Sequence, residues 1–404
     1  MKTMKNLLIA ALIAATSAAA ANDIKINLQR LNTNFKGEVC FVTPRAAIRP
    51  DGTGIMTTGL LDLYGDDVGL GIHILETADK GKTWSAIRPC KTLTQQKLPN
   101  GYHISFGDAN PIYHRKSGKI LLLGHSALYD KTGRKLAPPP RPRFTVWTVY
   151  DEKAKDFEPH RYLKMKNETE YFSCGSGGGA QCHELENGDL LIPVYYRSLE
   201  AAKDPWRTSY NTTIMRCSFD GRELKFIECG NSVSIPTVRG LYEPSLIKFK
   251  DKFFIALRND AKGYVASSKD GINIDKPKVL VFDDGKESGN YCTQQHWLIV
   301  NNKLYMVYTR KGANNDHVMR HRAPLFIAEF DTGKMCLIRS TEKIAVPERG
   351  ARLGNFGCIN ISPTEAWVTA AEWMQSWGPN RSDWKSCMKY GSDNSIFISK
   401  ITAE

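Results

Sequence analysis

The sequence lacks the marks of several common classes of protein. None of its ten cysteines falls in a CxxC pair, so a zinc or haem site has no motif to support it. No run rich in lysine and arginine stands out, although the formal net charge is +13. Beyond residue 21 no segment is apolar enough to cross a bilayer, and few segments have a helical period. We therefore expect no metal, no cofactor, no nucleic-acid partner and no membrane span.

The first 21 residues have the pattern of a secretory signal. Lys2 and Lys5 precede a short apolar stretch over residues 7–15, and alanines at 18–21 offer cleavage sites. The sequence thus predicts an exported protein, periplasmic or secreted, that begins near residue 22. Loss of the two lysines still leaves a charge of +11. Such an excess favours an anionic partner, and an acidic oligosaccharide or glycan suits an exported, monomeric protein.

A turn followed by a β-rich apolar run recurs six times, starting at residues 51, 117, 187, 251, 302 and 364. Each unit has three or four strand-like runs, which predicts an all-β, six-bladed β-propeller with four-stranded antiparallel blades over residues 22–404. The spacing disfavours the competing interpretation, a β-sandwich or two stacked domains. The last unit lacks a fourth strand. The alternating segment 24–31 would supply that strand and close the ring.

Polar residues recur where the first strand of each unit starts and where the second strand ends. Antiparallel neighbours place these positions on one face, around the axis, where the side chains are expected to converge on a pocket. An arginine guanidinium can donate two parallel hydrogen bonds to one carboxylate. Several arginines at this face therefore indicate an acidic ligand. The predicted substrate-binding residues are Arg45, Asp108, His125, Gln181, Arg197, Arg258, Gln295 and Arg310.

The octapeptide 77–84 has the pattern Ser/Thr-x-Asp-x-Gly-x-Thr-Trp. It predicts a hairpin turn in which Asp79 accepts backbone N–H bonds, Gly81 has a positive φ and Trp84 packs into the sheet. Decayed copies lie at residues 270–271 and 331–333.

The octapeptide resembles the Asp box of sialidases, which are six-bladed propellers, and the resemblance covers most of the chain after residue 21. It implies a clamp of three arginines on the substrate carboxylate: Arg45, Arg258, and either Arg310 or Arg352. It also implies an acid at Asp66 or Asp67 and a glutamate, Glu243, that activates a tyrosine nucleophile. The chain departs from the family at the start of the sixth unit, where residues 352–358 contain Phe356 and no tyrosine. The tyrosyl mechanism would then need Tyr291 or Tyr390.

Three functions remain open from the sequence. The first is an exo-glycosidase that releases a terminal acidic sugar such as sialic acid, with Asp67 as acid and Glu243 as base or activator. The second resembles the propellers that cleave rhamnose–glucuronate linkages, as hydrolase or lyase, and would use a histidine or tyrosine such as His296 or Tyr291. The third is a propeller that binds an acidic glycan without cleaving it.

Overall fold

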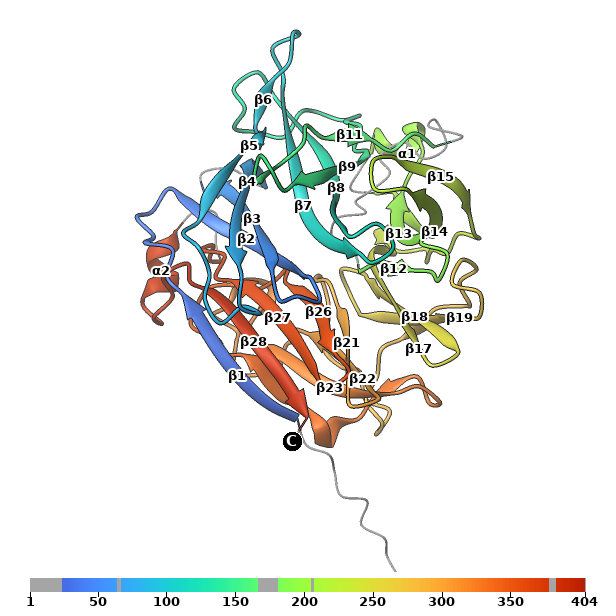
Figure 1. The fold of residues 1–404 in the computed structure, drawn as a ribbon. Helices are drawn as coiled ribbons and strands as arrows, with labels where there is room; N and C mark the ends of the chain where they lie inside the picture. Colours follow the sequence, from blue (N-terminus) through green and yellow to red (C-terminus); the bar gives the residue numbers. More distant parts are fainter. Residues whose placement is uncertain (1–23, 64–66, 166–180, 205–206, 378–382, 404) are drawn as a thin grey trace, which may run out of the picture.

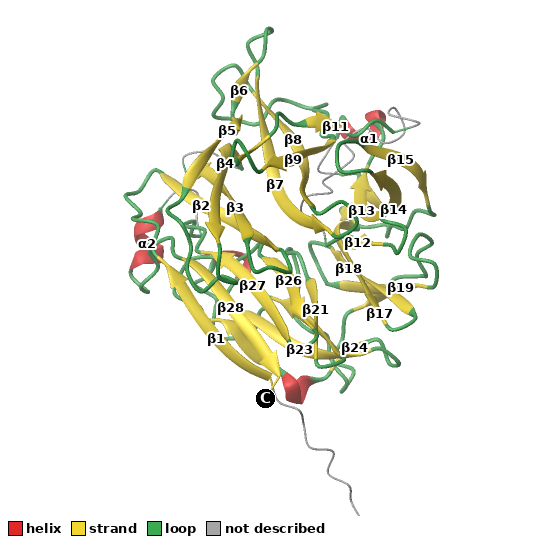
Figure 2. Ribbon diagram, viewed as in Figure 1, coloured by secondary structure: helices red, strands yellow, loops and turns green. Residues whose placement is uncertain are grey.

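In the computed structural model, residues 24–63, 67–165, 181–204, 207–377 and 383–403 are described. The predicted signal segment and Asp66 lie outside these residues. The described chain forms six antiparallel sheets that stand like blades around one axis (Figure 1). Strands and loops make up nearly all of the ring, and its few helices are short (Figure 2). The predicted all-β, six-bladed propeller is confirmed.

The first three blades follow one another along the chain. The strands of blade 1 are β2 (Val39–Ile48), β3 (Gly54–Asp62), β4 (Val68–Thr77) and β5 (Arg88–Thr94). Blade 2 contains β6 (Gln96–Lys97), β7 (His103–His114), β8 (Lys119–Tyr129), β9 (Thr145–Asp151), β10 (Asp156–Phe157) and β11 (Arg161–Tyr162). Blade 3 contains β12 (His183–Glu184), β13 (Leu190–Tyr196), β14 (Ser209–Phe219), β15 (Leu224–Cys229) and β16 (Arg239–Gly240), with helix α1 (Leu199–Ala202) after β13.

The other three blades complete the ring. Blade 4 contains β17 (Tyr242–Phe249), β18 (Lys252–Arg258), β19 (Tyr264–Ser268) and β20 (Lys278–Val279). Blade 5 contains β21 (His296–Val300), β22 (Lys303–Tyr308), η1 (Met319–His321), β23 (Leu325–Asp331), β24 (Cys336–Leu337), η2 (Arg339–Thr341) and β25 (Lys343–Val346). Blade 6 contains β26 (Gly357–Ser362), β27 (Glu365–Ala371), α2 (Trp384–Met388), β28 (Ile396–Ala403) and, from the other end of the chain, β1 (Ile24–Leu31).

The ring is closed by pairing between the two ends of the described chain. β1 pairs antiparallel with β28 along its whole length, from Ile24 opposite Ala403 to Leu31 opposite Ile396 (Figure 1). This confirms that segment 24–31 supplies the missing strand. This pairing gives blade 6 four strands, as in blades 1 and 4, and leaves no gap in the ring.

The core lies between the blades, because each sheet packs face to face against the sheets on either side. The second strand of each blade is therefore buried on both faces. All seven residues of β13 are buried, for example. Three fully buried tryptophans fill such spaces, and Trp367 of blade 6 packs with Met56 and Leu75 of blade 1. The apolar runs that repeat in the sequence are therefore the strands that hold the blades together.

The octapeptide 77–84 forms the turn after β4. Asp79 Oδ1 accepts a bond from the Thr83 backbone N–H at 2.9 Å, and Asp79 Oδ2 accepts one from the Thr83 hydroxyl at 2.6 Å. Gly81 has a φ of 63°, and a Cβ there would lie 2.5 Å from the Trp367 ring, so only glycine fits. Asp270 and Asp331 accept backbone bonds in the corresponding turns of blades 4 and 5.

Glu372, which follows β27, is predicted to make stability depend on pH. Burial raises the pKa of its carboxyl group to about 7. Hydrogen bonds from the Asp393 and Ser395 backbone N–H groups and the charge of Arg349 act to lower this pKa but are outweighed. Because the folded state holds this proton more tightly than the unfolded chain does, Glu372 makes its full contribution to stability below about pH 4.5. That contribution is lost as the pH rises through about 7. Glu372→Gln keeps an acceptor oxygen and removes the buried charge. Thermal unfolding from pH 4.5 to 8 should show the variant about 1–3 kcal/mol more stable than wild type at pH 8 and equal to it at the acid end; parallel curves would contradict this.

Candidate active site

Three strands, one each in blades 1, 2 and 4, contain a β-bulge at an equivalent position. In β2, β7 and β17 the register shifts at Thr43, Asp108 and Glu243, and these residues have φ values of 53°, 48° and 45°. Such bulges turn a strand side chain out of its regular direction, and a positive φ is uncommon for residues other than glycine. All three residues line one pocket at the axis of the ring. The bulges thus explain why Asp108 and Glu243, predicted as strand-start residues, reach the pocket.

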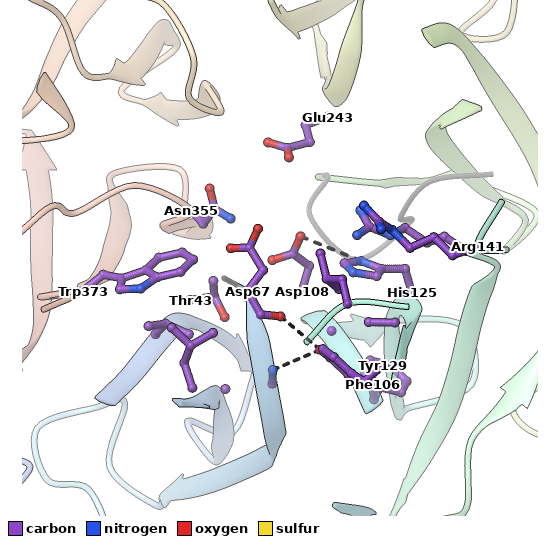
Figure 3. Close-up of a pocket in the computed structure, with 18 of the residues that line it drawn as sticks. Thr43, Asp67, Phe106, Asp108, His125, Tyr129, Arg141, Glu243, Asn355 and Trp373 are labelled. Atoms are coloured by element: carbon purple, nitrogen blue, oxygen red, sulfur yellow. Dashed lines mark hydrogen bonds and ion pairs between the residues drawn. The ribbon is translucent and has the colours of Figure 1, made fainter. Parts of the chain in front are cut away.

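The pocket has a volume of about 310 Å³, which is the lower end of the range for small-molecule sites. Residues of blades 1 to 4 line it, together with residues of blades 5 and 6 that lie outside the strands of those blades. Three carboxyl groups line it: Asp67, Asp108 and Glu243. Figure 3 shows Asp67 and Asp108 between Trp373 and Asn355 on one side and His125 and Arg141 on the other. Eight arginines also line it: Arg141, Arg143, Arg197, Arg239, Arg258, Arg320, Arg322 and Arg352.

Four of these arginines form a first group, from blades 4 to 6: Arg258, Arg320, Arg322 and Arg352. Arg258 Nη1 donates to Glu243 Oε2 at 2.6 Å in a buried ion pair. Arg322 Nε donates to the Cys292 carbonyl at 3.0 Å, and the guanidinium of Arg352 lies 3.6 Å from the centre of the Trp373 ring.

Two members of the first group are buried charges that form no salt bridge with a described carboxylate. Arg322 is 2% exposed and Arg352 is 3% exposed, and among the described residues no carboxylate forms an ion pair with either. The pKa of Arg352 is lowered by burial and by the nearby charges of Arg322 and Arg320, which outweigh the opposing negative charge of Asp67. The pKa of Arg322 is lowered by burial and by Arg258. Buried charges in proteins are normally paired, so this arrangement is suited to an anionic ligand.

The three carboxyl groups have pKa values shifted in opposite directions. Burial raises the pKa of Asp108, aided by the negative charges of Glu243 and Asp67 and opposed by Arg45. Burial also acts to raise the pKa of Asp67, but Arg352, Arg143, Arg320 and Arg322 together outweigh it, and the net direction is down. The pKa of Glu243 is lowered as well, because its ion pair with Arg258 outweighs its burial.

Opposed shifts of this kind separate an acid from a base. At neutral pH the carboxyl group that retains a proton most readily is Asp108, whereas Asp67 and Glu243 are ionised. The family resemblance implied an acid at Asp66 or Asp67; of the described carboxyl groups of the pocket, Asp108 is the one whose pKa is raised.

His125 lies next to Asp108, on the neighbouring strand β8, where it stands opposite Gly107. Its Nδ1 is 3.8 Å from Asp108 Oδ2 and has no hydrogen-bond partner among the described residues (Figure 3). Burial and the charges of Arg143 and Arg45 lower the pKa of His125 well below its ordinary value, so the imidazole is neutral. A neutral, buried ring nitrogen beside a pocket can accept a proton or a hydrogen bond from a ligand.

The other predicted site residues outside the pocket lining have partners of their own. Arg45 lies beneath the pocket, where it donates to Gln294 Oε1 at 3.1 Å, and His296 bonds Ser245 Oγ at 2.9 Å. Gln181 links β17 to β21, through Ser245 Oγ at 2.9 Å and the Trp297 backbone. Gln295 donates to Asn290 Oδ1, and the hydroxyl of Tyr291 bonds His321 Nδ1.

Arg310 is likewise turned away from the pocket. Its Nε and Nη2 donate to the two carboxylate oxygens of Glu342, at 2.9 and 2.6 Å. The structure thus brings Asp67, Asp108, His125, Arg197, Glu243 and Arg258 together at the pocket, and leaves Arg45, Gln181, Tyr291, Gln295, His296 and Arg310 out of its lining.

No tyrosine occupies the start of the sixth blade. Asn355 lines the pocket there, and Phe356 is fully buried with its ring 4.9 Å from that of His296. Of the pocket residues that the structure describes, Tyr129 and Tyr210 are the tyrosines. The Tyr129 hydroxyl already accepts from Gly69 N and donates to the Asp67 carbonyl oxygen, at 3.0 and 3.1 Å (Figure 3).

The fold and pocket define a six-bladed propeller with an axial site of arginines and carboxyl groups. No family model and no curated protein matches the sequence. Solved structures with the same fold include a crystal structure of a protein of unknown function from Dyadobacter fermentans, at 12% identity and a TM-score of 0.63, covering 93% of this chain and 99% of that one.

Sialidases are also among the structures with this fold. Trypanosoma rangeli sialidase has 14% identity and a TM-score of 0.60 over 92% of this chain, and NanB sialidase from Streptococcus pneumoniae, as its K499G mutant, has 12% and 0.59 over 92%. The chain spans 59% of the length of the first and 69% of the second. At these identities the likeness shows a shared fold.

Among the described residues, no helix has the length and apolarity needed to cross a bilayer. In the same part of the chain, no three or more His, Cys, Asp or Glu side chains are grouped as a metal site would require.

Proposed function

We propose that this protein is an exported glycoside hydrolase that releases a terminal acidic sugar from a glycan. The observation that carries the proposal is the pair Arg322 and Arg352, buried in the pocket without a described carboxylate partner. A sugar carboxylate would supply the missing counter-charge and would accept bidentate bonds from a guanidinium. The sialidases that share the fold make a glycan the first ligand to test.

The carboxyl groups suit the two proton transfers of hydrolysis. Asp108, with its raised pKa, would protonate the departing glycosidic oxygen. Asp67, ionised beside the first arginine group, would take a proton from the attacking water. Glu243 remains paired with Arg258 and holds that guanidinium in place.

The absence of a tyrosine at the sixth blade predicts the stereochemical outcome. Direct attack by water in one displacement inverts the anomeric carbon, whereas a covalent intermediate retains its configuration. Proton NMR in the first minutes of reaction, before mutarotation, should therefore show the released sugar with the opposite anomeric configuration. Retention would contradict a water-only route and would assign a nucleophile to Asp67 or Tyr210.

His125 favours one alternative, a lyase acting on a uronate. Its neutral Nδ1 would remove the proton from the carbon beside the carboxylate, the arginines would neutralise that carboxylate, and Asp108 would protonate the leaving oxygen. The products would then carry a new double bond and gain no water.

The test is incubation of the purified protein with matched glycans that end in sialic acid, in a uronate or in a neutral sugar, followed by chromatography of the released sugars. We expect release from an acidic glycan and none from its neutral counterpart. Products that absorb ultraviolet light at the wavelength of an unsaturated uronate would instead indicate a lyase. Binding of acidic glycans without any product would leave a glycan-binding propeller.

A further inference from the structure

Two aromatic side chains are exposed on the face of the propeller that carries the pocket. Among the described tryptophans Trp377 alone is exposed, at 48%, and Tyr390 is exposed at 55%. Both lie between β27 and β28, the second and third strands of blade 6 in chain order. In an antiparallel blade the second strand ends on the face where the first begins, and Asn355, just before β26, lines the pocket there. Aromatic side chains exposed beside a pocket are candidates for binding a ligand.

Both side chains are held by one loop of blade 5, the loop that joins β22 to β23. The indole Nε1 of Trp377 donates to the Asp316 backbone carbonyl oxygen at 2.9 Å, and the centre of the His321 ring lies 6.0 Å from that of Trp377. The ring of His317 stacks on Tyr390, with the ring centres 4.2 Å apart and 22° between the planes. These contacts fix the two aromatic rings before a ligand arrives, which lowers the entropic cost of binding.

The same loop carries two arginines of the pocket. Arg320 and Arg322 line the pocket, and His321 between them contacts Trp377. Arg320 and His321 have φ values of 57° and 51°, a left-handed conformation that is uncommon for residues other than glycine and that is often found at ligand sites. In blade 6, Trp373 lines the pocket and precedes Trp377 by four residues (Figure 3). Trp377 therefore lies next to the pocket lining.

We propose that Trp377 and Tyr390 form a second sugar-binding site, which takes the neutral sugar attached to the acidic one. The pocket volume of about 310 Å³ is small, so the rest of a glycan lies outside it. The C–H face of a pyranose packs on an indole or phenol ring. The side chain of Asp316, 93% exposed, accepts hydrogen bonds from sugar hydroxyls and repels a second anionic sugar. This inference rests on the proposed function, which places the acidic sugar in the pocket.

The first experiment measures binding of neutral sugars and involves no cleavage. In ¹⁵N-labelled protein, the indole N–H signal that is absent from Trp377→Phe belongs to Trp377. Titration of wild type with lactose and with cellobiose, two neutral disaccharides, should shift this signal. The matched control is Ile227→Ala, which removes a similarly exposed side chain (46%) on the outer strand β15 of blade 3 and should leave the titration unchanged. A Trp377 signal that neither disaccharide shifts would overturn the proposal.

The second experiment is calorimetry in the Asp108→Asn background, so that the ligands are not consumed. It compares N-acetylneuraminate with sialyllactose, and glucuronate with glucuronate linked to galactose. The longer ligand of the pair that binds should bind about 5–50-fold more tightly, because its neutral sugar stacks on an aromatic ring. Addition of Trp377→Ala should remove this difference and leave the affinity for the free acidic sugar unchanged. Trp377→Phe should keep most of the difference, and Ile227→Ala all of it.

An equal loss for short and long ligands in Trp377→Ala, or no loss for either, would overturn the neutral-sugar site while leaving the hydrolase intact. Tight binding of the longer ligand that depends on Trp377, without cleavage by wild type, would contradict the hydrolase and support the site. If no acidic ligand binds, the proposed function fails for these sugars, and the titration with neutral disaccharides alone decides the site. Self-association of wild type that Trp377→Ala abolishes would assign these side chains to a contact between copies of the chain and overturn the proposal.

Discussion

Replacement of Asp108 by asparagine is expected to lower kcat on a natural acidic glycan by roughly 10²–10⁴-fold, with little change in KM. The amide keeps the shape of the bulge in β7 but has no acidic proton for the leaving oxygen. Aryl glycosides whose leaving group needs no protonation should lose far less activity. Asp251→Asn, in the exposed turn between β17 and β18 away from the pocket, is the matched control.

The pH profile distinguishes this role from a structural one. Because Asp108 must be protonated to act and its pKa is raised, kcat/KM should be high below that pKa and fall as pH rises through it. In Asp108→Asn this fall should disappear. An equal loss on natural glycans and aryl glycosides, with the profile unchanged, would contradict the assignment of Asp108 as the proton donor.

Replacement of Arg322 by alanine is expected to lower kcat/KM for acidic glycans by roughly 10²–10³-fold. The guanidinium is buried, faces the pocket and has no described carboxylate partner, and loss of one member of a buried charge pair costs about 2–5 kcal/mol. The effect should fall mainly on KM, because the sugar carboxylate is bound before and during the reaction.

Arg310→Ala is the informative comparison for this variant. Arg310 belongs to the same blade, but its side chain is paired with Glu342 outside the pocket lining, so its loss should change kcat/KM by less than about threefold. Thermal unfolding of both variants shows whether either is simply misfolded. A large loss in Arg310→Ala together with a normal Arg322→Ala would contradict the proposed binding of a carboxylate by Arg322.

The blades could be predicted from the sequence because their signal is local and repeated. Each turn and the apolar run after it lie within a dozen residues, and six copies reinforce one another. The closing strand followed from one incomplete unit and one spare alternating segment at the other end of the chain. Asp108 and Glu243 were found for the same reason, since they occupy the same position in equivalent strands.

The rest of the site depends on contacts that a sequence does not display. Arg310 sits at the expected strand end, yet it faces Glu342, a partner 32 residues away in sequence. Arg322 reaches the pocket from a loop after the short helix η1, and no repeat marks that position. Arg141 and Arg143 follow the run Pro138, Pro139 and Pro140, whose composition marks a loop and indicates no ligand.

The bulges decide which residue of a strand faces the ligand, and they too were not predicted. In β2 the register shift brings Thr43 to the pocket and leaves Arg45, two residues later, bonded to Gln294 beneath it. A shift of this size reverses which side chains face the axis. The sequence favoured Arg45 for its place near the start of this strand, a criterion that takes no account of the bulge.

The most direct test of the account is cleavage of acidic oligosaccharides in water enriched in ¹⁸O, followed by mass spectrometry of the products. If the protein is a hydrolase of acidic sugars, the released sugar gains one ¹⁸O atom, neutral glycans are unchanged, and Asp108→Asn and Arg322→Ala both suppress the signal. Products without ¹⁸O that carry a new double bond, or an acidic pool that remains intact, would contradict it.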